Sequence, residues 1–192
     1  VQTCALPIYF AGYRHRDTLF LQDELEDATD QVIWSVDQGE PIPPRRPQDL
    51  SFAGNIVQAI LAYGRGDFAG KSLVSLDEVD RIIAIGSDRM MAAVTEARHT
   101  VLKPYLKPKH VGIASINSMM QCMMKEVCGQ CLQQHVDPET KVPTEVVFSC
   151  FNQDQPMDCV DFANLRQRLK TNSLAEKLTN RYLDLLLGRA SS

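Results

Sequence analysis

Four cysteines are spaced so that their thiols could gather around one metal centre. Cys122, Cys128 and Cys131 lie close together in the sequence, and Cys150 follows later, which gives the pattern C-x5-C-x2-C-x18-C. Plant-type [2Fe–2S] sites use C-x4-C-x2-C with a remote fourth cysteine, so this pattern is one residue looser. Gly129, between the second and third cysteines, permits the unusual dihedrals that a tight ligand loop needs. The spacing therefore predicts an iron–sulfur site.

Other uses of these thiols remain open. Structural zinc sites usually carry two close C-x2-C pairs, whereas only Cys128 and Cys131 form such a pair here. Cys159 could be an alternative ligand, although four thiols already complete a cluster. Ligation by His110 and His135 would give a Rieske-like centre, which requires two histidines in place of two cysteines. Zinc and unrelated thiols are the alternatives to iron–sulfur.

The composition of the chain is typical of a globular protein and gives no sign of nucleic-acid binding or of a membrane span. The chain has 192 residues, which allow one domain or two small ones, and 44% hydrophobic with 23% charged residues is ordinary for a soluble protein. A net charge of −4 gives no electrostatic reason to expect nucleic acid. No apolar run approaches the ~18 residues of a membrane span. Six cysteines without an export signal indicate a reducing cytoplasmic setting and a metal site.

Strand-like and helix-like segments alternate along the chain, which predicts an α/β fold with a parallel sheet. The segment 81–85 is apolar after its first residue, as in a strand covered on both faces. Residues 40–49 contain four prolines and form a loop. Asp17, Asp88 and Asp158 are expected helix caps, and Ser173 opens a capping box. The expected strands are 9–14, 31–36, 81–85, 111–116 and 146–148, and the expected helices are 18–27, 55–63, 89–101 and two after residue 158.

The first eight residues, VQTCALPI, resemble the translation of a sequencing-adapter remnant. We set residues 1–8 aside as a non-native leader, together with Cys4. We expect the remainder to be the C-terminal piece of a longer protein.

Three segments carry a family resemblance: Phe10-Ala11-Gly12-Tyr13-Arg14, the stretch from Ile85 to Val94 (IGSDRMMAAV), and Phe148-Ser149-Cys150 with the following Val160-Asp161-Phe162 and Arg168-Leu169. With these, the chain resembles the C-terminal part of the ferredoxin–NADP reductase-like electron-transfer flavoproteins. That group includes the dihydroorotate dehydrogenase electron-transfer subunit, the sulfide dehydrogenase flavin subunit and the small subunit of NADH-dependent ferredoxin:NADP oxidoreductase. The resemblance covers residues 9–169.

The resemblance implies a domain layout. Residues 9–102 would be a partial NAD(P)-binding domain of the ferredoxin-reductase type, 103–115 a linker, 116–160 a [2Fe–2S] domain, and 161–192 C-terminal helices. Ser87 stands where the family has proline. The family's FAD-binding barrel, its first nucleotide-domain strand and its Gly-rich phosphate loop have no counterpart here. We therefore predict that this chain alone binds NAD(P)H poorly.

The resemblance also implies a function. The chain would be a fragment, inactive alone, of an NAD(P)H-dependent iron–sulfur flavoprotein oxidoreductase. Electrons would pass from NAD(P)H to FAD, then to the [2Fe–2S] cluster, and finally to a partner flavoprotein subunit or fused domain. The implied iron ligands are Cys122, Cys128, Cys131 and Cys150. Gly86, Ser87 and Asp88 would lie near the nicotinamide half of the dinucleotide, and Gly12, Tyr13 and Arg14 near its adenosine ribose. A zinc-stabilised interaction module without redox chemistry is the second hypothesis.

Overall fold

The computed structural model describes residues 7–69, 71–117, 122–172 and 174–188. The chain divides into two compact units, residues 1–82 with 93–111 and residues 83–92 with 112–192. In the described residues, no helix is both long and apolar enough to cross a membrane.

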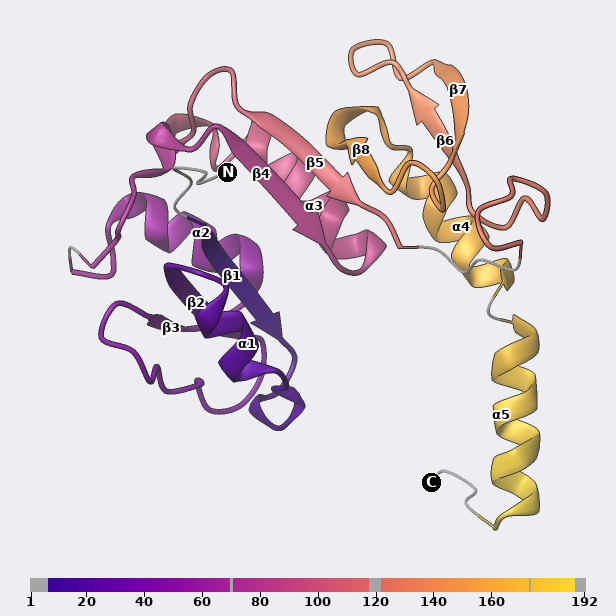
Figure 1. Cartoon of the computed structure of the whole chain (residues 1–192), viewed down its shortest axis with the longest axis horizontal. Coiled ribbons are helices and arrows are strands. Elements are labelled where there is room, and N and C mark those ends of the chain that lie inside the picture. The colour runs from indigo at the N-terminus through magenta and orange to yellow at the C-terminus, as the bar shows by residue number, and fades with distance from the viewer. Residues whose placement is uncertain (1–6, 70, 118–121, 173, 189–192) are drawn as a thin grey trace. The chain divides into compact units, whose positions relative to one another are not determined.

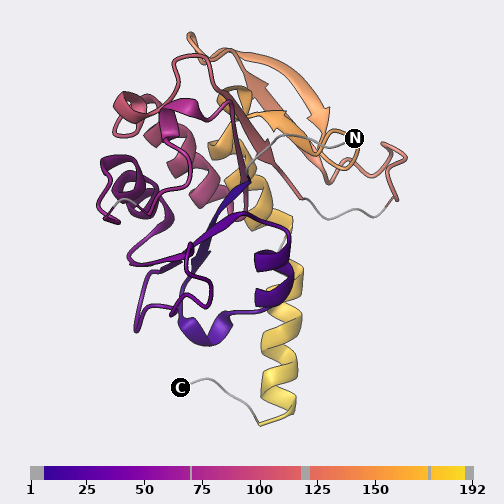
Figure 2. The same ribbon diagram turned by 60° about the vertical axis from the view of Figure 1, so that its left-hand side comes forward.

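A three-stranded parallel sheet forms the centre of the first unit. Its strands are β1 (Ile8–Tyr13), β2 (Gln31–Val36) and β3 (Leu50–Ala53), in the order β1-β2-β3 (Figures 1 and 2). Phe10 is paired with Ile33, and Ile33 with Leu50. Every residue of β2 is buried because it has a strand on each side. The expected parallel α/β layer is confirmed, although β3, directly after the proline-rich loop, was not predicted.

Successive side chains of β2 point to opposite faces of the sheet, so β2 contributes to two hydrophobic cores in this unit. Ile33 lies on one face, in a cluster with Leu50 and with Ala59, Ile60 and Tyr63 of the helix α2 (Ile56–Arg65). Trp34 lies on the other face with Val32, Val36, Ala11 and Ile42. A capping box between Asn55 and Gln58 starts α2. The predicted helix over 55–63 is confirmed.

The predicted helix over 18–27 is wrong in its first half. A 3-10 turn covers Arg16–Thr18, and the α-helix α1 spans only Gln22–Asp27. Leu21 interrupts the segment because its backbone is left-handed, with φ of 52°. Asp17 therefore caps no α-helix, and Phe20 is 66% exposed. Leu19 and Leu25 pack against the Trp34 cluster.

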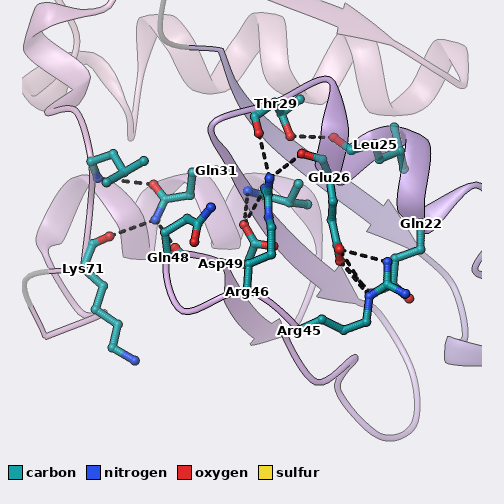
Figure 3. Close-up of polar contacts among 12 residues, drawn as sticks. Gln22, Leu25, Glu26, Thr29, Gln31, Arg45, Arg46, Gln48, Asp49 and Lys71 are labelled. Atoms are coloured by element: carbon teal, nitrogen blue, oxygen red, sulfur yellow. Dashed lines mark hydrogen bonds and ion pairs between the residues drawn. The ribbon is translucent and has the colours of Figure 1, made fainter.

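Two arginines tie the proline-rich loop to β2 and α1 (Figure 3). Asp49 is buried, and its Oδ1 accepts hydrogen bonds from the Val32 N–H and from Arg46 Nη2. Arg46 Nη1 also donates to the carbonyls of Glu26 and Thr29. Arg45 pairs with the buried Glu26 carboxylate. The loop is thus held by charged hydrogen bonds in place of regular secondary structure.

A second sheet has the order β4-β5-β8, formed by β4 (Arg81–Ile85), β5 (Val111–Ser115) and β8 (Asp154–Pro156). The strands β5 and β8 are antiparallel, with Ala114 paired with Gln155. Ile83 and Ile85 are 54% and 66% exposed, so the prediction that both faces of β4 are covered is wrong. The face of β4 that carries Ala84 is covered, since Ala84 is buried.

Helix α3 (Asp88–His99) follows β4 and buries Met91, Val94 and Ala97. The expected cap is off by one residue. The Ser87 hydroxyl accepts the N–H of Met90, and the Ser87 carbonyl accepts the N–H of Met91. Ser87 therefore caps α3, and Asp88 is the first helical residue.

The last part of the chain contains an antiparallel pair of strands and two helices (Figure 1). Strands β6 (Leu132–Val136) and β7 (Pro143–Phe148) pair with Leu132 opposite Phe148. Asp161, not Asp158, caps α4 (Phe162–Asn172) by accepting the Asn164 N–H. Helix α5 (Leu174–Leu186) follows, and the predicted capping box at Ser173 lies outside the described residues.

Candidate functional site

The β6–β7 hairpin brings two of the four predicted thiols together. Cys131 directly precedes β6, and Cys150 follows β7. The Ser149 N–H donates to the Cys131 carbonyl at 2.9 Å, which closes the open end of the hairpin. The Cys131 and Cys150 sulfurs are consequently 3.1 Å apart, with Cys131 buried and Cys150 partly exposed.

The other two thiols meet in the loop before β6. The N–H groups of Cys128 and Val127 and the Cys128 thiol all hydrogen-bond to the Cys122 sulfur, with the Val127 N–H at 3.4 Å. Left-handed backbone at Met123, Met124 and Glu126 winds the loop, and runs that include such residues turn successive N–H groups toward one concave side. These donors lower the pKa of the Cys122 thiol to about 6, with Cys128 as the largest contributor.

The other three thiols of the set all affect the Cys150 thiol. The pKa of Cys150 is raised to about 11, first by its hydrogen bond with Cys131, then by burial, and then by the charges of Cys131, Cys122 and Cys128. Within the described part of the chain, no group of three or more His, Cys, Asp or Glu residues could hold a single metal ion. The thiols thus form two pairs, Cys122 with Cys128 and Cys131 with Cys150.

Two thiol pairs fit a two-iron centre. A [2Fe–2S] cluster takes two protein ligands on each iron, whereas zinc takes all four on one ion. The described cysteines are all free thiols, the soft ligands that iron–sulfur centres use. A second observation concerns Arg168 of α4. Its Nη2 donates to the Gly129 carbonyl at 2.8 Å. Its Nε is buried and has no hydrogen-bond partner among the described residues. A spare cationic donor beside the loop suits an anionic centre.

The remaining candidate ligands are engaged elsewhere. His110 accepts from Arg98 at Nε2, 2.8 Å away, and its Nδ1 is 2.7 Å from the Lys107 carbonyl. The buried His135 bonds with Gln155 at 2.8 Å. Cys159 lies in a 3-10 turn, and burial raises its pKa, with Asp158 the largest charge contribution. These contacts leave the four-cysteine set as the candidate site.

The three residues predicted near the adenosine ribose lie at the end of β1, in the first unit. At Gly12 the backbone packs closely on α2, because a Cβ there would come within 3.2 Å of the Ile56 side chain. The Tyr13 ring stacks on Trp34 with centroids 6.3 Å apart, and burial, followed by the charge of Tyr9, raises its pKa. Arg14 is exposed. Packing contacts account for the presence of Gly12 and Tyr13 at these positions. The proposed role of all three residues in nucleotide binding stays a prediction.

The three residues predicted near the nicotinamide form the turn between β4 and α3. Gly86 has φ of 156°, and a Cβ there would clash with the Met90 side chain at 2.5 Å. Ser87 caps α3, and the Asp88 carboxylate accepts from Arg166 Nε at 2.7 Å. The ion pair between Asp88 and Arg166 therefore lies at the N-terminus of α3.

Sequence reasoning missed both arginines of α4. Arg166 holds Asp88, and Arg168 holds the backbone of the cysteine loop. Their spacing of two residues on a helix places them on different sides. The nearest sequence signal was Arg168 within the resemblance, but nothing local indicated which loop it would reach.

No family model matches the chain. Over 68 residues it is 44% identical to uncharacterized protein RP006 of Rickettsia prowazekii (strain Madrid E), a match that covers 35% of this chain and 9% of that protein. Among solved structures it is similar to an NADH-dependent reduced ferredoxin-NADP oxidoreductase, described for its insight into flavin-based electron bifurcation. That likeness has a TM-score of 0.60 at 18% identity and covers 92% of this chain.

The chain spans about half of the solved oxidoreductase chain, 52%, and less than a tenth of the curated relative. At 18% identity the likeness concerns the fold. The chain therefore has a mixed α/β fold similar to that of part of this solved oxidoreductase chain.

Proposed function

We propose that this chain is the electron-transfer part of an iron–sulfur flavoprotein oxidoreductase, with Cys122, Cys128, Cys131 and Cys150 as ligands of a [2Fe–2S] cluster. The observation that carries the proposal is the gathering of four free thiols as two pairs, one pair with its sulfurs 3.1 Å apart. When bound, the cluster accepts and releases one electron at a time. Cys122 and Cys128 would hold one iron, and Cys131 and Cys150 the other.

The chain's own residues would prepare the ligands and expose one side of the site. The N–H donors on Cys122 favour its thiolate, the form that binds metal. Around the loop, Met123, Met124 and Val127 are exposed, as is Phe151 after Cys150. Exposed apolar side chains at a redox site suit a partner surface. We assign this surface to a partner flavoprotein subunit or fused domain.

The proposal extends to the nucleotide and to the cell compartment. The fold likeness supports an NAD(P)-binding role for this region of the full-length protein, with Gly86, Ser87 and Asp88 toward the nicotinamide and Gly12, Tyr13 and Arg14 toward the adenosine. FAD would be held by a part outside this chain. We place the protein in the cytoplasm, where the free cysteines stay reduced.

Reconstitution with iron and sulfide under anaerobic conditions tests the proposal. We expect two irons and two sulfides per chain, a red-brown colour that bleaches with reductant, and a rhombic EPR signal of the reduced form. Cys131→Ser should lose all three. Cys159→Ser is the matched control and should keep them, because Cys159 stands outside the two pairs.

The result that contradicts the proposal is a colourless protein with one zinc and no sulfide. Such a protein would be the alternative, a zinc-stabilised interaction module, since zinc has no redox chemistry.

A further inference from the structure

Helix α4 supports the cysteine loop through Arg168. The guanidinium Nη2 lies 2.8 Å from the Gly129 carbonyl and 3.5 Å from the Gln130 carbonyl, the two residues between Cys128 and Cys131. Its Nε is buried and has no partner within the described residues. One cation is therefore fixed beside the segment that joins the two thiol pairs.

These contacts orient the backbone of the loop. A trans peptide is planar, so its C=O and N–H point in opposite directions. With the carbonyls of Gly129 and Gln130 aimed at Arg168, the N–H groups of Gln130 and Cys131 point away from the guanidinium. Those N–H groups are then free to donate to sulfur on the other side of the loop. Hydrogen bonds of this kind tune iron–sulfur potentials.

The positive charge of Arg168, like hydrogen bonds to the sulfurs, favours the reduced form of a cluster bound at this site. A guanidinium stays protonated at all ordinary pH values. Its Nε is removed from water, and a charge is screened less when it is away from solvent. Reduction adds one negative charge to an anionic centre, so a fixed neighbouring cation stabilises the reduced form relative to the oxidised form.

We propose that Arg168 is a positioning residue that holds the Gly129–Gln130 backbone between the two thiol pairs and raises the reduction potential of the cluster bound there. The effect on the reduction potential rests on the proposed function. The positioning of the Gly129–Gln130 backbone concerns only contacts within this chain.

Thiol reactivity of the metal-free, full chain tests the positioning role. Arg168→Gln should expose the buried Cys131 to alkylation about tenfold faster, the factor expected when one charge-assisted hydrogen bond is lost. Arg181→Gln, a change of the same charge on the exposed face of α5, is the control and should leave the rate unchanged. Equal Cys131 rates in Arg168→Gln and in the unchanged chain overturn the positioning role.

An EPR-monitored redox titration of the reconstituted chain tests the potential. Arg168→Gln should lower the ratio of reduced to oxidised cluster about tenfold at a given potential, which is about 59 mV for a one-electron couple. Arg168→Lys keeps the charge but loses the planar fork, so its potential should stay closer to that of the unchanged chain while its Cys131 rate rises. Partial loading of a variant does not disturb this comparison because the midpoint is read only from loaded molecules.

The outcomes separate the two claims. An unchanged midpoint in Arg168→Gln, with a normal cluster, overturns the role in potential and leaves the proposed function standing. An unchanged chain that takes up no iron and sulfide overturns the proposed function and that role together, while the alkylation rates still decide whether Arg168 positions the loop.

Discussion

The Cys122 sulfur accepts hydrogen bonds from both N–H groups at the end of its loop, those of Val127 and Cys128. Such donors stabilise the thiolate and not the thiol, so the pKa falls to about 6. Cys150 is in the opposite situation, because its hydrogen bond with Cys131, burial and the nearby sulfurs raise its pKa to about 11. Cys122 and Cys150 should therefore be distinguishable from each other by their reactivity.

In the metal-free chain, iodoacetamide should therefore modify Cys122 before Cys150. Only a thiolate reacts, so the rate at Cys122 should rise with pH through a midpoint near 6 and be almost constant above pH 7. Cys150 should still be protonated and slow at pH 8. Peptide mapping by mass spectrometry across a pH series measures both rates. A midpoint near 9 for Cys122, the ordinary thiol value, would show that its loop donors are not formed.

At the scale of elements, the proline-rich loop depends on one buried carboxylate. The Asp49 side chain is fully buried, and Arg46 donates to Asp49 Oδ1 and Oδ2 at 2.8 Å each. The same carboxylate accepts the Val32 N–H of the central strand at 2.9 Å. Removing the carboxylate would leave a buried N–H and a partly buried guanidinium without partners.

We expect Asp49→Ala to lower the free energy of unfolding by about 3 kcal/mol, the usual cost of breaking a buried ion pair from one side. Urea unfolding followed by Trp34 fluorescence reports on this unit specifically, because Trp34 is the one tryptophan and lies in β2. Asp23→Asn is the matched control. Asp23 is 80% exposed in its pair with Arg45, so its loss should cost less than about 1 kcal/mol. Equal effects of the two substitutions would contradict the structural role of Asp49.

For the whole molecule, we expect the two proposed nucleotide segments to form no complete phosphate site in this chain. Dinucleotide sites place the pyrophosphate on a Gly-rich turn at a helix N-terminus. Here the N-terminus of α3 already carries the Asp88 carboxylate, paired with Arg166. In the described sheets β1 and β4 are each an end strand, and the Ile83 and Ile85 side chains of β4 are exposed on one face of the second sheet.

We therefore expect the purified chain to bind NADPH with a dissociation constant of about 1 mM or weaker, which is no more than ~4 kcal/mol of binding free energy. Isothermal titration calorimetry with NADPH and NADH measures it, and ADP-ribose serves as the control ligand without the nicotinamide. Micromolar binding of NADPH would refute this expectation and would mean that the residues of this chain suffice for the nucleotide.

From the amino-acid sequence we could predict which thiols to consider, the α/β alternation and the strand over residues 31–36 that is β2. These follow from spacing and periodicity, which act over a few residues. The predictions from sequence misjudged features that depend on one backbone angle or one hydrogen bond, such as the break at Leu21 and the caps Ser87 and Asp161. The strand β6, LQQHV, escaped prediction because its polar residues hide the alternation that buried strands show.

How the thiols combine depends on the tertiary structure. Cys131 and Cys150 are neighbours because β6 and β7 pair with Leu132 opposite Phe148, and a shift of one residue in this pairing would turn one of the two sulfurs away from the other. Arg168 reaches the cysteine loop from 39 and 38 residues away in the sequence. Spacing can nominate a set of ligands, but strand register and helix packing set the distances between sulfurs and place the charge beside them, because both arise from contacts between residues far apart in the chain.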